Sequence, residues 1–271
     1  MSHLQNLHTH TTYCDGIDTP EQMILTAIEK GFSSIGFSGH SYMPYSIIGG
    51  MSPKTTGLYK NEIRKLKEKY LDSIEIYCGI EFDMYSPVEL DGYDYVIGSV
   101  HYLNCDGEVV GFDRSSEVVR SVIDTYFHGD GMRYAKAYYE ALAELPNNGD
   151  IDIIGHFDLI TKHAESTLFF DENSKEYKIC ALQAAEALKG KVPLFEVNTG
   201  AIARGYRTTP YPSIFLLKEL RQMGFGACIT SDCHDAKMLD CGYYDAAELL
   251  RVCGYKEKYI LTDQGFIPVS L

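Results

Sequence analysis

The chain has 271 residues, of which 45% are hydrophobic and 12% aromatic, which is enough to build a large core in one α/β domain. Its formal net charge of −14 argues against general binding to nucleic acid or to an anionic membrane surface, because the phosphate groups would be repelled. The N-terminus has no basic stretch followed by an apolar run and no segment is long and apolar enough for a membrane span, so a cytoplasmic protein is expected.

Short apolar runs alternate with helical patterns along the chain. In chain order, the runs predict buried parallel strands at 34–40, 74–82, 93–101, 151–158, 193–199 and 226–234. The intervening segments predict helices at 20–30, 54–71, 116–144, 172–189, 211–223 and 243–252. No low-complexity linker interrupts this series, so one domain over residues 1–271 is expected. Such a β/α series can close into a barrel or form an open sheet, and periodicity does not choose between them.

Imidazoles and carboxylates lie where the predicted strands end. They are His8 and His10 in "NLHTHTTYCDG", then His40, Glu81, His101, His156, Asp232 and His234. In a β/α barrel the carboxyl ends of the strands converge on one face, so these residues would meet there. Residues two apart in a strand point to the same side, which lets His8 and His10 serve one cluster.

Each of these residues also has a simpler interpretation. A single histidine in a strand is often a buried, hydrogen-bonded side chain, and a single carboxylate is often a cap or an ion-pair partner. The joint pattern favours metal, because clustered imidazoles and carboxylates are costly to bury without one, and mixed nitrogen and oxygen ligands suit zinc, manganese or iron. Two groups of residues are expected to bind no metal: His3, His128 and His163 as surface or structural residues, and Glu196 and Asn198 as supporting or capping residues.

Seven segments, in order, resemble the polymerase and histidinol phosphatase (PHP) family, and its histidinol-phosphatase branch in particular. They are "HTHTTYCDG", "GFSGH", "GIEFD", "YDYVIGSVHYL", "GHFDLI", "EVNTG" and "SDCH", within residues 5–240. The resemblance implies a distorted seven-stranded β/α barrel with a trinuclear metal site. One departure is Asn6, where many relatives have an aspartate, and it concerns the support of the first metal.

The resemblance also implies a set of metal ligands. His8, His10, Glu81 and Asp232 would hold one metal; Glu81 would bridge to a second, held also by His101 and His156; Asp15, His40 and His234 would hold the third. Among these, Glu81, His156, Asp232 and His234 are expected to act in catalysis. Two or three divalent transition metals would attract a phosphate group despite the acidic protein.

The loop "NTGAIARGYRTTP" after the fifth predicted apolar run offers two arginines for phosphate, Arg204 and Arg207. Arg204 is favoured, because this loop contributes a phosphate-binding arginine in the family. For Arg207, a solvated surface position is an equal alternative.

Other phosphatase chemistries lack their signatures. No cysteine is followed six positions later by arginine, and no phosphate-binding loop motif is present. The leading hypothesis is hydrolysis of histidinol phosphate in histidine biosynthesis. A phosphoesterase for another small phosphomonoester, phosphotyrosine or a nucleotide is the second hypothesis, and a non-catalytic metal-binding module is the third. The eight cysteines contain no C-x-x-C pair, so free thiols are expected.

Overall fold

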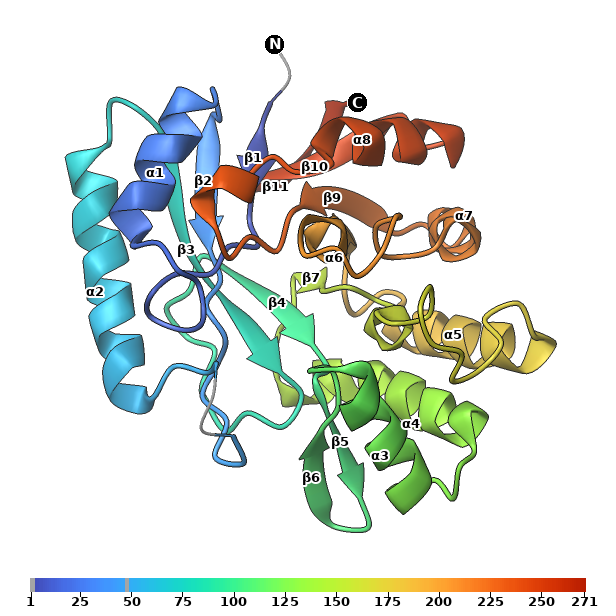
Figure 1. Cartoon of the computed structure of the whole chain (residues 1–271). Coiled ribbons are helices and arrows are strands. Elements are labelled where there is room, and N and C mark those ends of the chain that lie inside the picture. The colour runs from blue at the N-terminus through green and yellow to red at the C-terminus, as the bar shows by residue number, and fades with distance from the viewer. Residues whose placement is uncertain (1–2, 47–48) are drawn as a thin grey trace.

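A computed structural model describes residues 3–46 and 49–271. Seven parallel strands form a nearly closed barrel, as the family resemblance implied (Figure 1). In spatial order they are β1 (Gln5–Asn6), β2 (Ser34–Phe37), β3 (Glu75–Asp83), β4 (Tyr95–Ser99), β7 (Ile153–Ile154), β8 (Leu194–Asn198) and β9 (Gly226–Thr230).

The ring closes just beyond the ends of its first and last strands. Thr9 forms a parallel bridge with Cys233. The amide of His10 donates to the Cys233 carbonyl at 2.8 Å, and the amide of Cys233 donates to the His8 carbonyl at 3.0 Å. The closure therefore brings two histidine-containing segments, 8–10 and 232–234, side by side.

Helices cover the outside of the barrel. They are α1 (Pro20–Glu29), α2 (Pro53–Lys69), α3 (Ser116–Tyr126), α4 (Gly131–Glu144), α5 (Lys175–Leu188), α7 (Ile214–Gln222) and α8 (Tyr243–Val252), while the one-turn helix α6 (Gly200–Ala203) lies in the loop after β8. Three short 3-10 helices accompany them, η1 (Leu145–Asn148), η2 (Leu159–Thr161) and η3 (Ala236–Met238). Helices α1 and α2 lie on one side of the barrel, and α4, α5 and α7 on the opposite side (Figure 1).

One helix prediction is wrong. The sequence pattern indicated a single helix over 116–144, but the structure has two, α3 and α4, with a break between them. Gly129 adopts a φ of +77°, which ends the helical path, and the carboxylate of Asp130 then caps α4 by accepting from the amides of Met132 and Arg133.

Two antiparallel hairpins were not expected from the periodicity. Strands β5 (Tyr102–Cys105) and β6 (Glu108–Gly111) pair across an Asp106–Gly107 turn, in which both residues have positive φ. Asp-Gly is a strong hairpin signal, and it was the local clue to this element. Strands β10 (Glu257–Thr262) and β11 (Gly265–Ser270) form the second hairpin, which the Gln5 side chain ties to β1 through two hydrogen bonds with the backbone of Leu261.

The barrel interior changes character along the strands. Apolar side chains fill its amino-terminal end: Leu7, Tyr77, Tyr95, Ile97, Ile153, Leu194, Cys228 and Leu261. Gly79 leaves the space for the Tyr95 ring, because a Cβ there would lie 2.3 Å from it. Two residues further along several strands the same face becomes polar, with Ser99, Glu196 and Thr230.

All eight cysteines are free. Among the described residues, no helix combines the length and apolar character that crossing a bilayer requires.

Candidate metal centre

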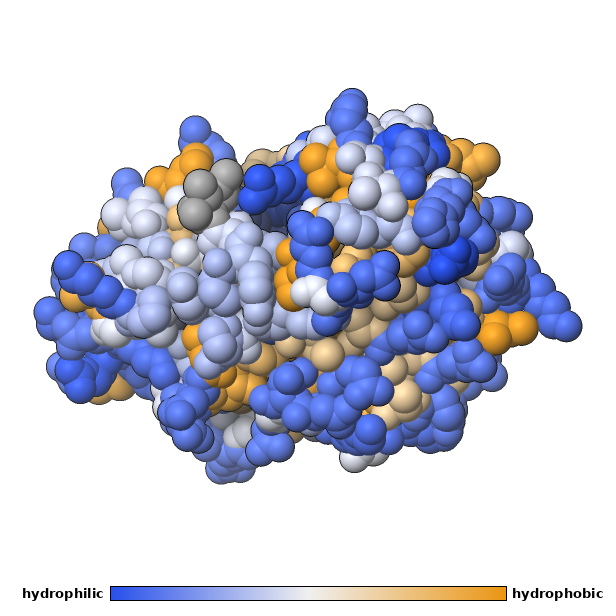
Figure 2. Space-filling model, turned by 90° about the horizontal axis from the view of Figure 1, so that it is seen from below, coloured by the Kyte–Doolittle hydropathy of each residue, from blue (hydrophilic) through white to orange (hydrophobic). Residues whose placement is uncertain are grey.

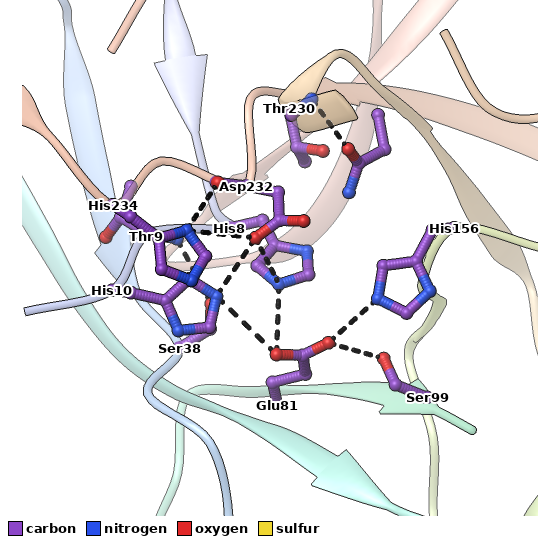
Figure 3. A network of polar contacts seen from close by, with 12 residues as sticks. His8, Thr9, His10, Ser38, Glu81, Ser99, His156, Thr230, Asp232 and His234 are labelled. Carbon is purple, nitrogen blue, oxygen red and sulfur yellow. Dashed lines mark hydrogen bonds and ion pairs between the residues drawn. The ribbon is translucent and has the colours of Figure 1, made fainter. Parts of the chain in front are cut away.

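All nine residues expected to bind metal are gathered at the carboxyl ends of the strands. Segments beyond β1 supply His8, His10 and Asp15, and the segment beyond β2 supplies His40. Strand β3 carries Glu81, while His101, His156, Asp232 and His234 follow β4, β7 and β9. Figure 3 shows several of these side chains turned toward one another around Glu81.

Glu81 lies at the centre of the cluster and is 1% exposed. Its Oε2 lies 2.7 Å from His40 Nδ1 and 3.3 Å from His8 Nε2. Its other oxygen, Oε1, lies 3.0 Å from His156 Nε2 and 3.4 Å from His101 Nε2. The two oxygens of one carboxylate thus face different sets of imidazoles, which is the arrangement a bridging ligand requires.

Candidate ligand atoms fall into three overlapping groups. Within each group they lie within 4.8 Å of one another, and the groups are His8, His10 and Asp232; His40, Glu81 and His101; and His10, Asp15, His40 and His234. The partition differs in detail from the one that the resemblance implied. His40 is grouped with Glu81 as well as with Asp15, and His10 belongs to two groups, while His156 stands outside these groups and contacts Glu81.

The hydrogen bonding of these atoms fits metal ions. The buried atoms His8 Nε2 and His10 Nε2 lie within ion-pair distance of Glu81 Oε2, but none of the three makes a hydrogen bond of good geometry among the described residues. A buried polar atom without a partner costs about 1–3 kcal/mol, so three of them converging on one spot need a compensating ligand. A divalent cation that prefers nitrogen and oxygen donors satisfies all three at once.

The carboxylates and imidazoles of the cluster shift one another's pKa values. Burial would raise the pKa of the Glu81 carboxyl, but the surrounding imidazoles of His40, His8 and His101 hold it well below its usual range. For His10 the opposite holds, since burial and the neighbouring His234 and His40 lower its pKa to about 3. The ionised Glu81 carboxylate and the neutral His10 imidazole are in the protonation states that metal ions bind. Burial opposes protonation of His8, His40 and His101, but the neighbouring carboxylates raise their pKa values, so these imidazoles would release their protons on binding a metal.

A second layer of buried residues orients the imidazoles. Glu196 Oε2 lies 2.8 Å from His8 Nδ1, and because a carboxylate accepts, Nδ1 carries the proton and Nε2 is left to face Glu81. Glu196 Oε1 accepts from the amide of His156 at 2.7 Å. Asp83 lies 3.2 Å from His101 Nδ1 in the same manner.

Asn6 takes part in this support. Its Oδ1 accepts from the His8 amide at 3.1 Å, and its Nδ2 donates to Ser231 Oγ at 2.6 Å. An asparagine at this position thus still links the segment that bears His8 to the segment that precedes Asp232.

The structure places the two arginines of the 199–213 loop differently. Arg204 reaches the cluster: its Nη2 donates to Asp232 Oδ2 at 2.9 Å, and its side chain stays 31% exposed. Arg207 is buried, and its guanidinium donates to the backbone or hydroxyl oxygens of Thr161 and Thr209. It lines neither cavity at the cluster, so it is neither a solvated surface residue nor a group turned toward a substrate.

Two adjoining cavities open at the cluster. The inner one, about 230 Å³, is lined by Glu81, His156, Asp232 and Arg204 among others. The outer one, about 320 Å³, shares His40 and His101 with it and extends toward Tyr102 and Arg114. Figure 2 shows the molecule from below the view of Figure 1, where hydrophilic residues cover much of the surface and apolar patches lie between them.

Sequence reasoning missed Lys162 and Asp113, which line both cavities. The Lys162 ammonium lies 2.7 Å from the Asp113 carbonyl oxygen and 3.3 Å from its carboxylate. The sequence did hold one signal for Lys162: a lysine six residues after His156 follows a predicted strand end in an acidic protein, where it could bind an anionic substrate. The pairing with Asp113 had none, because the two residues are 49 positions apart.

Two curated relatives of this chain are named as histidinol-phosphatases. The chain is 26% identical to the histidinol-phosphatase of Bacillus subtilis over 88% of this chain and 96% of that protein. It is 27% identical to a probable histidinol-phosphatase of Schizosaccharomyces pombe over 86% of this chain and 81% of that protein.

Solved structures share the fold. A histidinol phosphate phosphatase from Lactococcus lactis, complexed with zinc, L-histidinol and phosphate, superposes with a TM-score of 0.73 at 20% identity, over 98% of this chain and 99% of that one. One from Listeria monocytogenes, described as a putative histidinol phosphatase, gives 0.76 at 20% identity, over 89% and 99%. The family model of the PHP domain matches residues 6–200. With that match spanning most of the barrel and the cluster of imidazoles and carboxylates at its carboxyl end, the chain belongs to the PHP domain family.

Proposed function

We propose that this protein is a metal-dependent phosphatase that hydrolyses L-histidinol phosphate to L-histidinol and phosphate, as a single-domain cytoplasmic enzyme of histidine biosynthesis. One observation carries the proposal: members of all three groups of metal-ligand atoms line the same cavity as two basic side chains, Arg204 and Lys162. Metal and phosphate sites are thus adjacent. The relatives named histidinol-phosphatase, aligned over most of the chain, support the choice of substrate.

The proposed ligands are the nine clustered residues: His8, His10, Asp15, His40, Glu81, His101, His156, Asp232 and His234. Their mixture of imidazole and carboxylate suits two or three ions of zinc, manganese or iron. When bound, such ions would acidify a water molecule and neutralise charge on the phosphoryl oxygens. Glu81, with oxygens on two sides of the cluster, and His156, Asp232 and His234 would then act at the reacting group.

The chain's own cations complete the phosphate site. Arg204 binds the Asp232 carboxylate through Nη2 and contacts the Asp232 carbonyl oxygen and His234 Nδ1 through Nη1, and its partly exposed guanidinium can present its remaining hydrogens to a phosphate in the inner cavity. Lys162, held by Asp113, faces the same cavity as a fixed positive charge. Together they can orient the phosphoryl group before the reaction and balance its charge.

The outer cavity suits the alcohol part of the substrate. Asp83 and Asp113 line it, and Tyr102 adds an aromatic wall. Histidinol carries an amine and an imidazole, both of which accept a proton and then pair with carboxylates. Although Lys162 and Arg114 also line this cavity, a cationic, aromatic alcohol can pair with its carboxylates and pack on Tyr102.

Turnover tests the proposal. Purified protein is loaded separately with manganese, zinc or iron and assayed on L-histidinol phosphate beside phosphotyrosine, a nucleoside monophosphate and a simple alkyl phosphate. We expect kcat/KM to be highest for L-histidinol phosphate by on the order of a hundredfold, because the other alcohols lack charges matched to the outer cavity. Equal rates across the panel would favour a general phosphoesterase, and no turnover with any metal would refute the enzyme.

A further inference from the structure

Two loops carry the cations of the phosphate site. The first follows β7 and runs from His156 to Glu165, with Lys162 in it. The second follows β8 and spans 199–213, with Arg204 directly after the one-turn helix α6. Neither cation sits on a strand or a long helix, so the distance between them depends on how the two loops are held together.

Arg207 holds the second loop to the first. Its Nη1 donates to the Thr161 carbonyl oxygen at 2.7 Å and also to the Thr161 hydroxyl. Thr161 is fully buried and immediately precedes Lys162, so a bond to its backbone restrains the lysine. The Arg207 amide donates to the Ala201 carbonyl of α6 at 3.3 Å, which ties the same residue to the turn that presents Arg204.

The guanidinium of Arg207 is buried and bound within the protein, so it is not available to bind a ligand. The residue is 8% exposed, its remaining donors bond Thr209, and its guanidinium lies 5.1 Å from the ring centroid of Tyr211. The buried carboxylate of Asp158 interacts favourably with its charge. Burying a guanidinium is expensive unless its donors are satisfied, and here four hydrogen bonds to oxygens of the two loops satisfy them.

Two further contacts join the same loops. The amide of Ser213 donates to Asp158 Oδ2 at 2.9 Å in the interior. On the surface, the amide and hydroxyl of Thr208 donate to the carboxylate of Glu165 at 2.9–3.0 Å. The second loop is itself closed by paired hydrogen bonds between Asn198 and Tyr211.

We infer that Arg207 is a positioning residue that locks the Arg204 loop onto the Lys162 loop and thereby sets the spacing of the two cations that bind phosphate. The inference rests on the proposed function only for the identity of the substrate, since inorganic phosphate reports on the same subsite. Arg204 contacts the ligand; Arg207 acts through Thr161 and α6.

The principal test compares Arg207→Met with the wild type in the metal-loaded protein. We expect KM for L-histidinol phosphate and the Kd for inorganic phosphate, measured by calorimetry, each to rise by on the order of tenfold. The change in kcat should stay within about threefold, and metal content should not change, because no metal-ligand atom contacts Arg207. Arg207→Lys, which retains one donor and the charge, should recover part of the loss.

A surface variant keeps the inference testable if Arg207→Met does not fold. Glu165→Ala removes three hydrogen bonds between the same loops without leaving a buried group, and should raise the Kd for phosphate by about twofold to threefold. Its matched control is Glu140→Ala, an exposed glutamate of α4 far from both loops in sequence, which should change nothing.

The outcomes separate the two proposals. A wild type that binds phosphate but hydrolyses no L-histidinol phosphate refutes the proposed substrate and leaves the Kd comparison valid. An unchanged Kd for phosphate in folded Arg207→Met overturns the positioning role, as does a loss confined to thermal stability. A fall in kcat with loss of metal would overturn it too, because Arg207 would then act on His156.

Discussion

The two ends of the barrel are made by the same strands, yet their inward-facing side chains differ completely. At the amino-terminal end, Tyr95 and Leu194 pack into an apolar cluster in which each is 1% exposed. Ser99 lies four residues after Tyr95 in β4, and Glu196 lies two residues after Leu194 in β8. Both side chains face the barrel interior, where Ser99 donates to Glu81 and Glu196 accepts from His8. The difference separates two tasks: apolar packing holds the barrel closed, while the polar end holds unpaired atoms that only a ligand can satisfy.

This comparison predicts that substitutions at the polar end change metal binding and catalysis, while those at the apolar end change stability alone. Each substitution tests one side of that division and is compared with a control or matched variant.

The largest effect is expected for Glu81→Gln. Five imidazoles lie within 3.5 Å of this carboxylate, and the amide would remove the negative charge that they share. We expect kcat to fall on the order of a thousandfold, with loss of bound metal by elemental analysis. His3→Ala, an exposed histidine outside the cluster, serves as the control. A Glu81→Gln protein with full metal content and full kcat would contradict the central role of this carboxylate.

At the apolar end, Leu194→Ala should destabilise the fold without altering the chemistry. The side chain is 1% exposed within the barrel core, so its truncation should lower the free energy of unfolding by about 3 kcal/mol. Denaturant unfolding measures this change, and metal content and KM should match the wild type. Leu168→Ala, with 77% of the residue exposed, should be neutral. A Leu194→Ala protein that lost metal would show that the two ends are not independent.

Glu196→Gln tests the boundary between the two ends. The carboxylate accepts from His8, the His156 amide, Asn198 and Thr230, and thereby fixes the orientation of two proposed ligands. We expect zinc affinity, measured by competition with a chelating dye, to weaken by about tenfold to a hundredfold.

Thr230→Val is the matched variant, because it removes one donor to Glu196 and leaves the His8 contact in place. Its zinc affinity should fall by less than that of Glu196→Gln. Equal affinities for the wild type and Glu196→Gln would mean that packing alone orients His8.

The smallest effect is expected for Arg204→Ala. Phosphate oxygens carry their charge before the reaction, so loss of this cation should raise KM by on the order of tenfold with a smaller change in kcat. The metal content should be retained. Arg64→Ala, an exposed arginine of α2, is the control. Unchanged KM and kcat in Arg204→Ala would leave Lys162 as the cation to test.

Much of the fold followed from local pattern. Buried parallel strands are continuous apolar runs, and the polar residues at their ends are contiguous with them in sequence, so strand positions and candidate ligands could be read together. The single helix predicted over 116–144 failed because Gly129 and Asp130, a local stop and a cap, were outweighed by a long helical pattern. The β5–β6 hairpin was missed although its Asp106–Gly107 turn is a strong local signal, because its strands are only partly buried and do not form a continuous apolar run.

The sequence by itself determined which strand ends carry ligand-type residues, because that information is local. The tertiary structure decided what depends on contacts between distant segments: that His40 faces both Glu81 and Asp15, that Lys162 pairs with Asp113, and that Arg207 is buried against Thr161 while Arg204 reaches Asp232. Two arginines three residues apart have the same local chemistry, and only the packing of their loop against its neighbour directs one inward and the other toward the site.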